Sequence, residues 1–241
     1  MPAIRIWSTR SVRQDMDWQA LWLSVKLSSI TVLVLIPLAI LAGRALAYRQ
    51  FVGKSWVEAL IMVPLVLPPT VIGYYLLVGL GSQSWLGQWL ERLTGQQLVF
   101  HFSGLVLASV LVNIPFALQP IQRAFEAVPH DVRDAAACCG MSKLKILLKI
   151  ELPMVWPGVL TALVLCFSHV LGEFGVVLMM GGNIAGETKT ISISIYDSVQ
   201  AFDFGAAGTM SLVLLLFAIT ALALTTSLSR RLGGQRGANH R

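Results

Sequence analysis

The sequence is poor in charged residues. Only 12% of its 241 residues are Asp, Glu, Lys or Arg, against about a quarter in an average soluble domain. Hydrophobic residues make up 56% of the chain, and the mean hydropathy is +0.72. Five long stretches contain no Asp, Glu, Lys or Arg at all. This distribution excludes an ordinary soluble domain and indicates an integral membrane protein.

The sequence has few cysteines and no nucleotide-binding motif. The three cysteines are Cys138, Cys139 and Cys166, and no Cys-x-x-Cys or His-rich spacing indicates a metal site. The Gly-x-x-x-x-Gly-Lys-[Ser/Thr] phosphate loop is missing, so the chain is not expected to hydrolyse ATP. We therefore predict a chain that is not an enzyme by itself and that binds no metal or cofactor.

The five uncharged stretches predict the fold. They cover residues 27–43, 59–90, 93–122, 152–172 and 204–229. Each supplies the roughly 17–25 residues that a helix needs to cross a bilayer. The sequence thus predicts an all-α, polytopic membrane helix bundle of five transmembrane helices, within a transmembrane domain at 18–230. Residues 1–17 are charged and lack the apolar core of a cleavable signal peptide, so we expect the first span to be retained.

The positive charges predict the orientation. Twelve Lys and Arg residues lie in the segments 44–54, 123–151 and 230–241, against five in the segments of the opposite side. Because cytoplasmic loops are enriched in Lys and Arg, the twelve-cation side is assigned to the cytoplasm. This places 1–17 in the periplasm or at the interface, and 231–241 as a cytoplasmic tail. We interpret the net charge of +6 as a result of the Lys and Arg residues that set the membrane topology, and no nucleic-acid partner is expected.

The cytoplasmic loop 124–153 has the pattern of a docking element. Asp131 is expected to cap a short helix that runs from Val132 to Cys139 and ends at Gly140, whose missing side chain permits a left-handed turn. The residues before Gly140 are small, which suits insertion into a narrow cleft. Ser142 is expected to cap a second, interfacial helix that leads into the fourth span.

This loop resembles a known family. The run Asp134-Ala135-Ala136, then Gly140, then Ile150-x-Leu152-Pro153 is similar to the EAA loop of permease subunits of binding-protein-dependent ABC importers, with Asp in place of the usual Glu. The resemblance implies a type I ABC importer permease fold. It also implies that these seven positions couple the chain to a cytoplasmic ATPase that uses ATP.

Three further stretches resemble molybdate permeases, at 65–77, 171–175 and 182–190, and sulfate permeases resemble them less closely. The resemblance implies the membrane-spanning subunit of a molybdate importer in the bacterial inner membrane. Its expected partners are a second copy of itself, a dimer of ATPase subunits, a periplasmic molybdate-binding protein and the lipid bilayer.

The spans contain few candidates for the substrate path. The predicted spans contain no Lys or Arg except Lys26, which lies near a membrane end, so we expect a transient cavity of neutral polar groups, which releases an anion easily. The candidates by position are Thr70, Asn113, Ser168 and His169, although packing between helices explains each equally well.

Glu173 lies beyond the fourth span, between two glycines. We interpret it as a structural or gating residue that accepts backbone N–H bonds where Gly172 and Gly175 break the helix. The prolines in the spans are read first as kinks and second as hinges.

Several alternatives stay open. An importer of the same class for sulfate, tungstate or another ligand fits the same motifs. A proton-coupled secondary transporter normally shows ionisable relays in mid-span and internal repeats, and an integral-membrane enzyme needs a catalytic pair, whereas His169 has no evident partner in the sequence.

Overall fold

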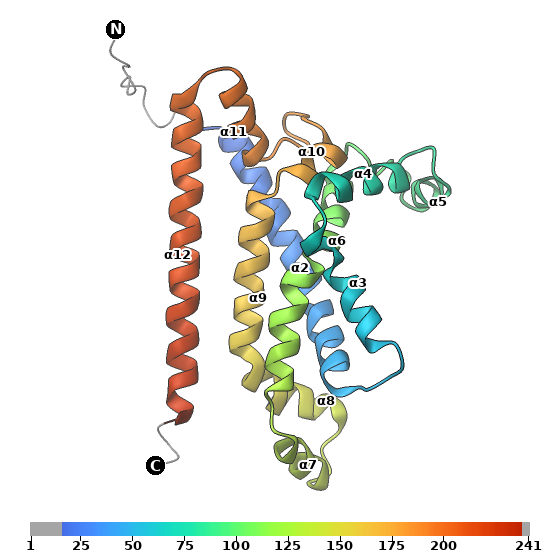
Figure 1. Cartoon of the computed structure of the whole chain (residues 1–241), viewed down its shortest axis with the longest axis vertical. Coiled ribbons are helices and arrows are strands. Elements are labelled where there is room, and N and C mark those ends of the chain that lie inside the picture. Colours follow the sequence, from blue (N-terminus) through green and yellow to red (C-terminus); the bar gives the residue numbers. More distant parts are fainter. Residues whose placement is uncertain (1–15, 238–241) are drawn as a thin grey trace. The chain divides into compact units, whose positions relative to one another are not determined.

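The computed structural model describes residues 16–237, and helices account for most of this range, with no strand among these residues (Figure 1). The helices are α2 Trp18–Tyr48, α3 Lys54–Val66, α4 Pro69–Leu80, α5 Trp85–Thr94, α6 Phe102–Glu126, α7 His130–Cys138, α8 Lys143–Ile146, the π-helix η1 Leu147–Glu151, α9 Leu152–Gly172, α10 Gly175–Gly181, α11 Ile191–Gln200 and α12 Phe204–Gly237. The all-α prediction is confirmed.

Four helical segments of the described residues are long and apolar enough to cross a membrane. They are Trp18–Tyr48, Phe102–Glu126, Lys143–Gly172 and Phe204–Thr225. A fifth span results if Lys54–Val66 and Pro69–Leu80 count as one, although this pair is bent by 109°. The bend falls at Leu67 and Pro68, because proline removes a backbone donor and disfavours helix in the residue before it.

The structure corrects two boundaries of the predicted spans. The stretch 59–90 is not one continuous helix, because it is divided among α3, α4 and the start of α5. The stretch 93–122 begins with a non-helical segment, and its helix starts only at Phe102. The uncharged stretches therefore identified these two regions correctly as apolar and helical, but they did not predict where the helices begin and end.

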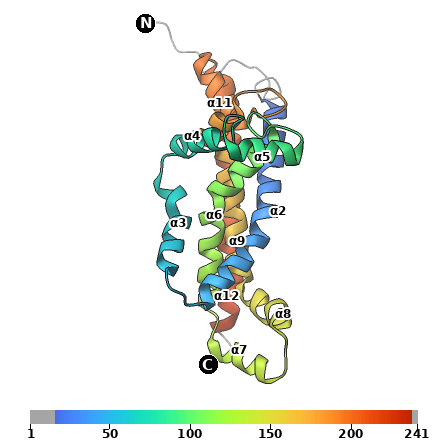
Figure 2. The same ribbon diagram turned by 90° about the vertical axis from the view of Figure 1, so that its right-hand side faces the viewer.

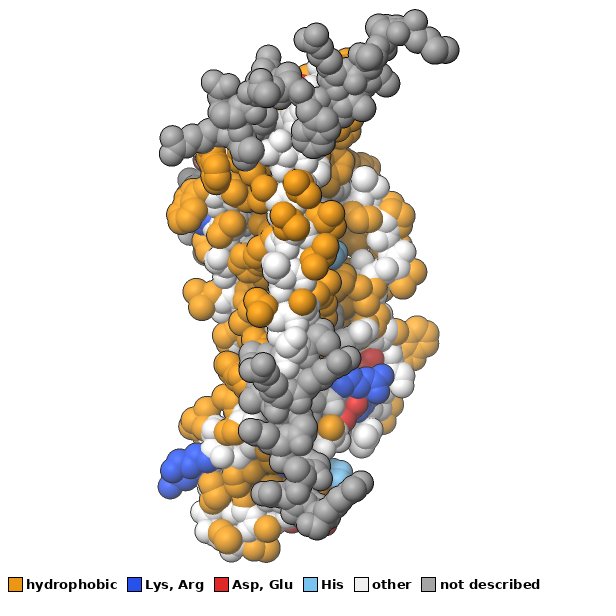
Figure 3. Space-filling model, turned by 90° about the vertical axis from the view of Figure 1, so that its left-hand side faces the viewer, with side chains coloured by type: hydrophobic (Ala, Val, Ile, Leu, Met, Phe, Trp, Pro, Cys, Tyr) orange, Lys and Arg blue, Asp and Glu red, His pale blue; other side chains and the backbone are white. Residues whose placement is uncertain are grey.

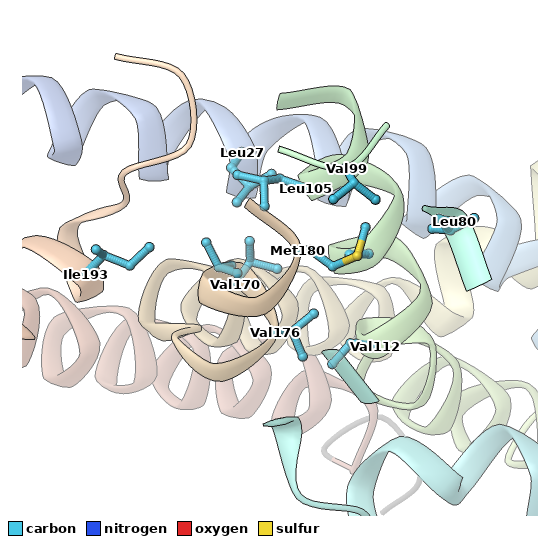
Figure 4. Close-up of a cluster of buried hydrophobic side chains, with 11 residues drawn as sticks. Leu27, Leu80, Val99, Leu105, Val112, Val170, Val176, Met180 and Ile193 are labelled. Atoms are coloured by element: carbon cyan, nitrogen blue, oxygen red, sulfur yellow. The ribbon is translucent and has the colours of Figure 1, made fainter. Parts of the chain in front are cut away.

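The chain forms two compact units. Of the described residues, unit 1 comprises 16–31, 67–112 and 168–220, and its core is a cluster of aliphatic side chains from α2, α4, α6, α9, α10 and α11. In Figure 4, Leu27, Leu105, Val170 and Met180 lie within this cluster, and each is at most 1% exposed. Helix α10 also packs closely on α4, where a Cβ added to Gly73 would lie 2.8 Å from Met179 Cβ. The close approach explains why glycine occupies this position.

Of the described residues, unit 2 comprises 32–66, 113–167 and 221–237, and it contains the predicted cytoplasmic loop. Helices α6 and α9 approach closely in this unit, since a Cβ on Gly158 would clash with the Ala124 side chain and the Pro120 carbonyl. Figures 1 and 2 both show the short α7 beyond the end of α8. The loop is thus a defined pair of helices attached to the spans.

Hydrophobic side chains cover much of the face that Figure 3 shows, and the charged side chains visible there form small groups. On α12, the large apolar side chains Leu212, Leu215, Leu216, Ile219, Leu222 and Leu224 are all exposed. A continuous exposed apolar helix of this kind is stable in lipid and not in water. This exposure agrees with a chain that crosses the membrane several times.

The segment between the fourth and fifth predicted spans contains a helix of its own, α11, at Ile191–Gln200. Helix α12 continues to Gly237, beyond the expected end of the span at 229. The interpretation of residues 1–15 as a periplasmic or interfacial segment lies outside the described residues.

Candidate functional site

The first candidate site is the loop 124–153. Helix α7 begins at His130 after Pro129, and no side chain caps it, so the expectation that Asp131 is the cap is wrong. Asp131 lies instead in the first turn, where its carboxylate still interacts favourably with the helix dipole. The helix therefore starts two residues earlier than predicted.

Gly140 ends α7 as expected. Its φ is +73°, in the left-handed region that favours glycine. The Gly140 N–H donates to the Ala137 carbonyl at 2.9 Å, and the Met141 N–H donates to the Ala136 carbonyl at 3.2 Å. These two bonds are those of a Schellman motif, which satisfies the last carbonyls of a helix.

The structure shows which face of α7 is available to a partner. Ala136 is only 6% exposed and faces its own chain, whereas Ala135, Ala137 and Cys138 are exposed. The Ala136 side chain is thus not on the exposed face of α7, and its expected part in coupling to an ATPase stays a prediction. Because residues three and four apart share a helix face, Arg133 and Ala136 lie on the same face of α7, the face directed toward the rest of the chain.

The second half of the motif lies where the loop joins the fourth span. The Ser142 hydroxyl caps α8 by accepting the Lys145 N–H at 3.4 Å, as predicted. Helices α8, η1 and α9 then follow one another directly, so Ile150 is in η1 while Leu152 and Pro153 open α9. Ile150 and Leu152 are partly buried and Pro153 is exposed. A movement of the loop is therefore connected to α9 without a flexible linker.

A charged cluster at this junction was missed by reasoning from the sequence. Glu151 is fully buried and accepts hydrogen bonds from Arg44 Nε at 2.5 Å, Arg44 Nη2 at 3.3 Å and Arg133 Nε at 3.0 Å. The Arg133 guanidinium carbon lies 3.5 Å from the centre of the Tyr48 ring. The sequence indicated both arginines only as topology markers, because nothing local links residues 107 positions apart.

The second candidate site is a cavity of about 540 Å³ in unit 1. It is lined by Pro69, Thr70, Ser168, His169, Gly172, Glu173, Phe174 and Gly175. Three of the four predicted path residues, Thr70, Ser168 and His169, thus lie together. Asn113 belongs to unit 2, is fully buried and does not line the cavity.

Glu173 forms the inner wall of this cavity. It is 6% exposed, and its Oε1 accepts the Val176 N–H at 3.4 Å. Since α9 ends at Gly172 and α10 begins at Gly175, the structure agrees with the expected helix break between the glycines. His169 Nδ1 lies 3.6 Å from Glu173 Oε2, so the structure shows a neighbour for this histidine that was not evident in the sequence.

The lining is suited to weak contacts with an anion. Its polar groups are two hydroxyls, an imidazole and one carboxylate, and none of the eight lining residues is Lys or Arg. The Ser168 hydroxyl is buried and has no hydrogen-bond partner among the described residues. A buried hydroxyl without a partner retains an unused donor.

Comparison with known proteins gives the family. Residues 35–234 match the family described as binding-protein-dependent transport system inner membrane component. The molybdenum transport system permease protein ModB of Azotobacter vinelandii is 37% identical over 206 residues, which cover 86% of this chain and 91% of that protein. A probable sulfate transport system permease protein cysT of Prototheca wickerhamii is 31% identical over 175 residues, covering 73% and 68% of the two chains.

A solved structure shares the fold. The crystal structure of a bacterial ABC transporter involved in the import of the acidic polysaccharide alginate matches with a TM-score of 0.75 at 16% identity, covering 95% of this chain and 85% of that chain. The family match covers most of the sequence, including the loop 124–153 and the cavity. The chain therefore belongs to the family of inner-membrane components of binding-protein-dependent transport systems.

Proposed function

We propose that this chain is the membrane-spanning permease subunit of an ATP-driven importer of molybdate. The observation that carries the proposal is the 37% identity to a molybdenum permease across 86% of the chain. The sulfate permease is less similar and shares a smaller part of the sequence. Import of sulfate is the second candidate, because the sulfate permease is still 31% identical over 73% of this chain.

The chain does not supply the energy for transport. It lacks a phosphate loop, so ATP is hydrolysed by two copies of a separate cytoplasmic ATPase subunit, and the chain itself binds no cofactor. Ala135, Ala137 and Cys138 form the exposed face of α7 that enters a cleft of this ATPase. Small side chains suit such a cleft because they allow the two backbones to approach closely. Asp134, Gly140, Ile150, Leu152 and Pro153 complete the coupling motif.

A periplasmic molybdate-binding protein delivers the anion, in keeping with the family description. Two copies of the chain enclose the path, because five spans are too few to surround one. The N-terminus is periplasmic and the C-terminus cytoplasmic, since the loop that meets the ATPase has to face the cytoplasm.

The cavity of unit 1 is the proposed place where the anion is held briefly. Thr70, Ser168 and His169, which line this cavity, are the neutral donors proposed to contact the oxyanion. Glu173 does not bind the anion, because like charges repel. It holds the turn between α9 and α10 and so shapes the wall.

Uptake by the reconstituted importer tests this proposal. The chain and its ATPase are placed in proteoliposomes with internal ATP, and the binding protein is supplied outside with radiolabelled molybdate. We expect uptake that requires ATP and withstands an excess of sulfate. If sulfate abolishes uptake and labelled sulfate accumulates instead, the substrate assignment is wrong, whereas tungstate competition would widen the specificity to similar oxyanions.

A pair of matched variants tests the coupling surface. Ala135→Glu places a charge on the exposed face of α7, and Ala201→Glu makes the same change at an exposed position after α11. We expect Ala135→Glu to insert normally but to lose co-purification with the ATPase, because an unpaired buried charge is costly. Ala201→Glu should retain it. Normal ATPase binding by Ala135→Glu would show that this face of α7 does not dock.

A further inference from the structure

The Glu151 cluster joins four elements of unit 2. Glu151 lies in η1, Arg44 and Tyr48 lie one turn apart on α2, and Arg133 projects from α7. The Tyr48 ring in turn packs edge-on against Phe125 of α6, with ring centres 5.9 Å apart, and Phe125 is fully buried. The cluster therefore ties the docking helix to the ends of two spans.

Helix α7 has few other inward contacts. Among its nine residues Ala136 alone is buried, and the Arg133 side chain is 24% exposed. An alanine methyl group contributes little apolar area, so among the described residues the specific link between α7 and the rest of unit 2 is Arg133, through its contacts with Glu151 and Tyr48. Without this link, a displacement of α7 would change the conformation of the turns on either side of it and would not move the spans.

The burial of Glu151 makes this link strong and selective. Its side chain is 0% exposed and its two oxygens accept three guanidinium hydrogen bonds. Removing one partner of a buried pair is strongly destabilising, whereas exposed pairs contribute little. The stacking of Arg133 on Tyr48 adds a cation–π contact that fixes the plane of the guanidinium.

We propose that Glu151 is a positioning residue that binds Arg133 of α7 and Arg44 of α2 at once, so that a displacement of α7 moves α2 and the start of α9 with it. The π-helical turn that carries Glu151 leads directly into Leu152 of α9. This inference rests on the proposed function, since it concerns how ATPase closure reaches the spans. It assigns to three residues outside the family motif the transmission of that movement.

Arg133→Gln is the first test variant. It leaves Glu151 paired with Arg44 through two hydrogen bonds, so the buried carboxylate keeps a partner and the chain is expected to fold. Arg123→Gln is the matched control, because Arg123 forms an ion pair with Glu126 and its side chain is 84% exposed. Both variants are assembled with the ATPase and the binding protein in proteoliposomes.

The measured quantity is the number of molybdate ions taken up per ATP hydrolysed. We expect Arg133→Gln to retain ATPase binding and ATP hydrolysis while this ratio falls by about a factor of ten, a common size for coupling between sites. Arg123→Gln should keep the wild-type ratio. A wild-type ratio in Arg133→Gln would overturn the proposal, and so would loss of ATPase binding by this variant.

A second pair of variants separates positioning from stability. Glu151→Gln leaves two neighbouring cations without a counter-charge, and adding Arg44→Gln relieves their repulsion. We expect the double variant to regain thermal stability while its uptake per ATP stays low, because Arg133 is still unanchored. Recovery of both properties would overturn the proposal. If the wild-type importer takes up no molybdate, the proposed function fails instead, so the two failures are distinguishable.

Discussion

Replacement of Gly140 is the most direct test of the geometry of the docking helix. Its φ of +73° is unfavourable for any residue with a Cβ, yet a Cβ added there would meet nothing within 4 Å. The cost of substitution is therefore purely conformational, with no contribution from a steric clash. A left-handed conformation costs an ordinary residue about 1–2 kcal/mol, and asparagine tolerates it better.

The expected order of damage is Asn, then Ala, then Val at position 140. A loss of about 1.4 kcal/mol shifts the opening equilibrium of the last turn of α7 about tenfold. Hydrogen exchange of the Cys139, Gly140 and Met141 amides, whose N–H groups donate to carbonyls within α7, reports this opening. We expect faster exchange and lower uptake in Gly140→Val, with Gly140→Asn close to wild type. Equal exchange and equal uptake in the two variants would refute the assignment of a strained left-handed cap.

Three further outcomes are expected. A membrane-impermeant maleimide should label the exposed cysteines 138–139 only after the membrane is opened. In a cysteine-free variant, Gly95→Cys should be labelled from outside. The reverse labelling pattern would show that the topology is inverted. Thr70→Val should lower uptake at normal assembly, whereas Asn113→Ala should lower the yield of folded protein, because Asn113 is fully buried and does not line the cavity. Glu173→Ala should destabilise the chain by about 1 kcal/mol in a thermal assay, because the Val176 N–H loses its hydrogen-bond acceptor. Glu173→Gln should keep the stability of the wild type, because the amide oxygen can still accept this bond. Equal stability of the two variants would show that Glu173 does not support the backbone in this way.

The sequence alone determined the features that depend on short segments of the chain. Long apolar runs indicate membrane helices because an unsatisfied backbone is costly in hydrocarbon, and α9 matches its predicted bounds of 152–172. Gly140 and Ser142 were predictable as helix ends, since a left-handed turn and a hydroxyl cap depend on the residue itself and its immediate neighbours. The family resemblance likewise rested on residues close together in the sequence.

The tertiary structure alone decided which side chains meet. No local pattern joins Glu151 to Arg44, because their contact results from packing between helices that are far apart in the sequence. Packing likewise turns Ala136 inward, and it brings Thr70 and Ser168, but not Asn113, into the lining of one cavity. Hydrophobic length and backbone preference specify where helices form, whereas the fit between their surfaces specifies which residues act together.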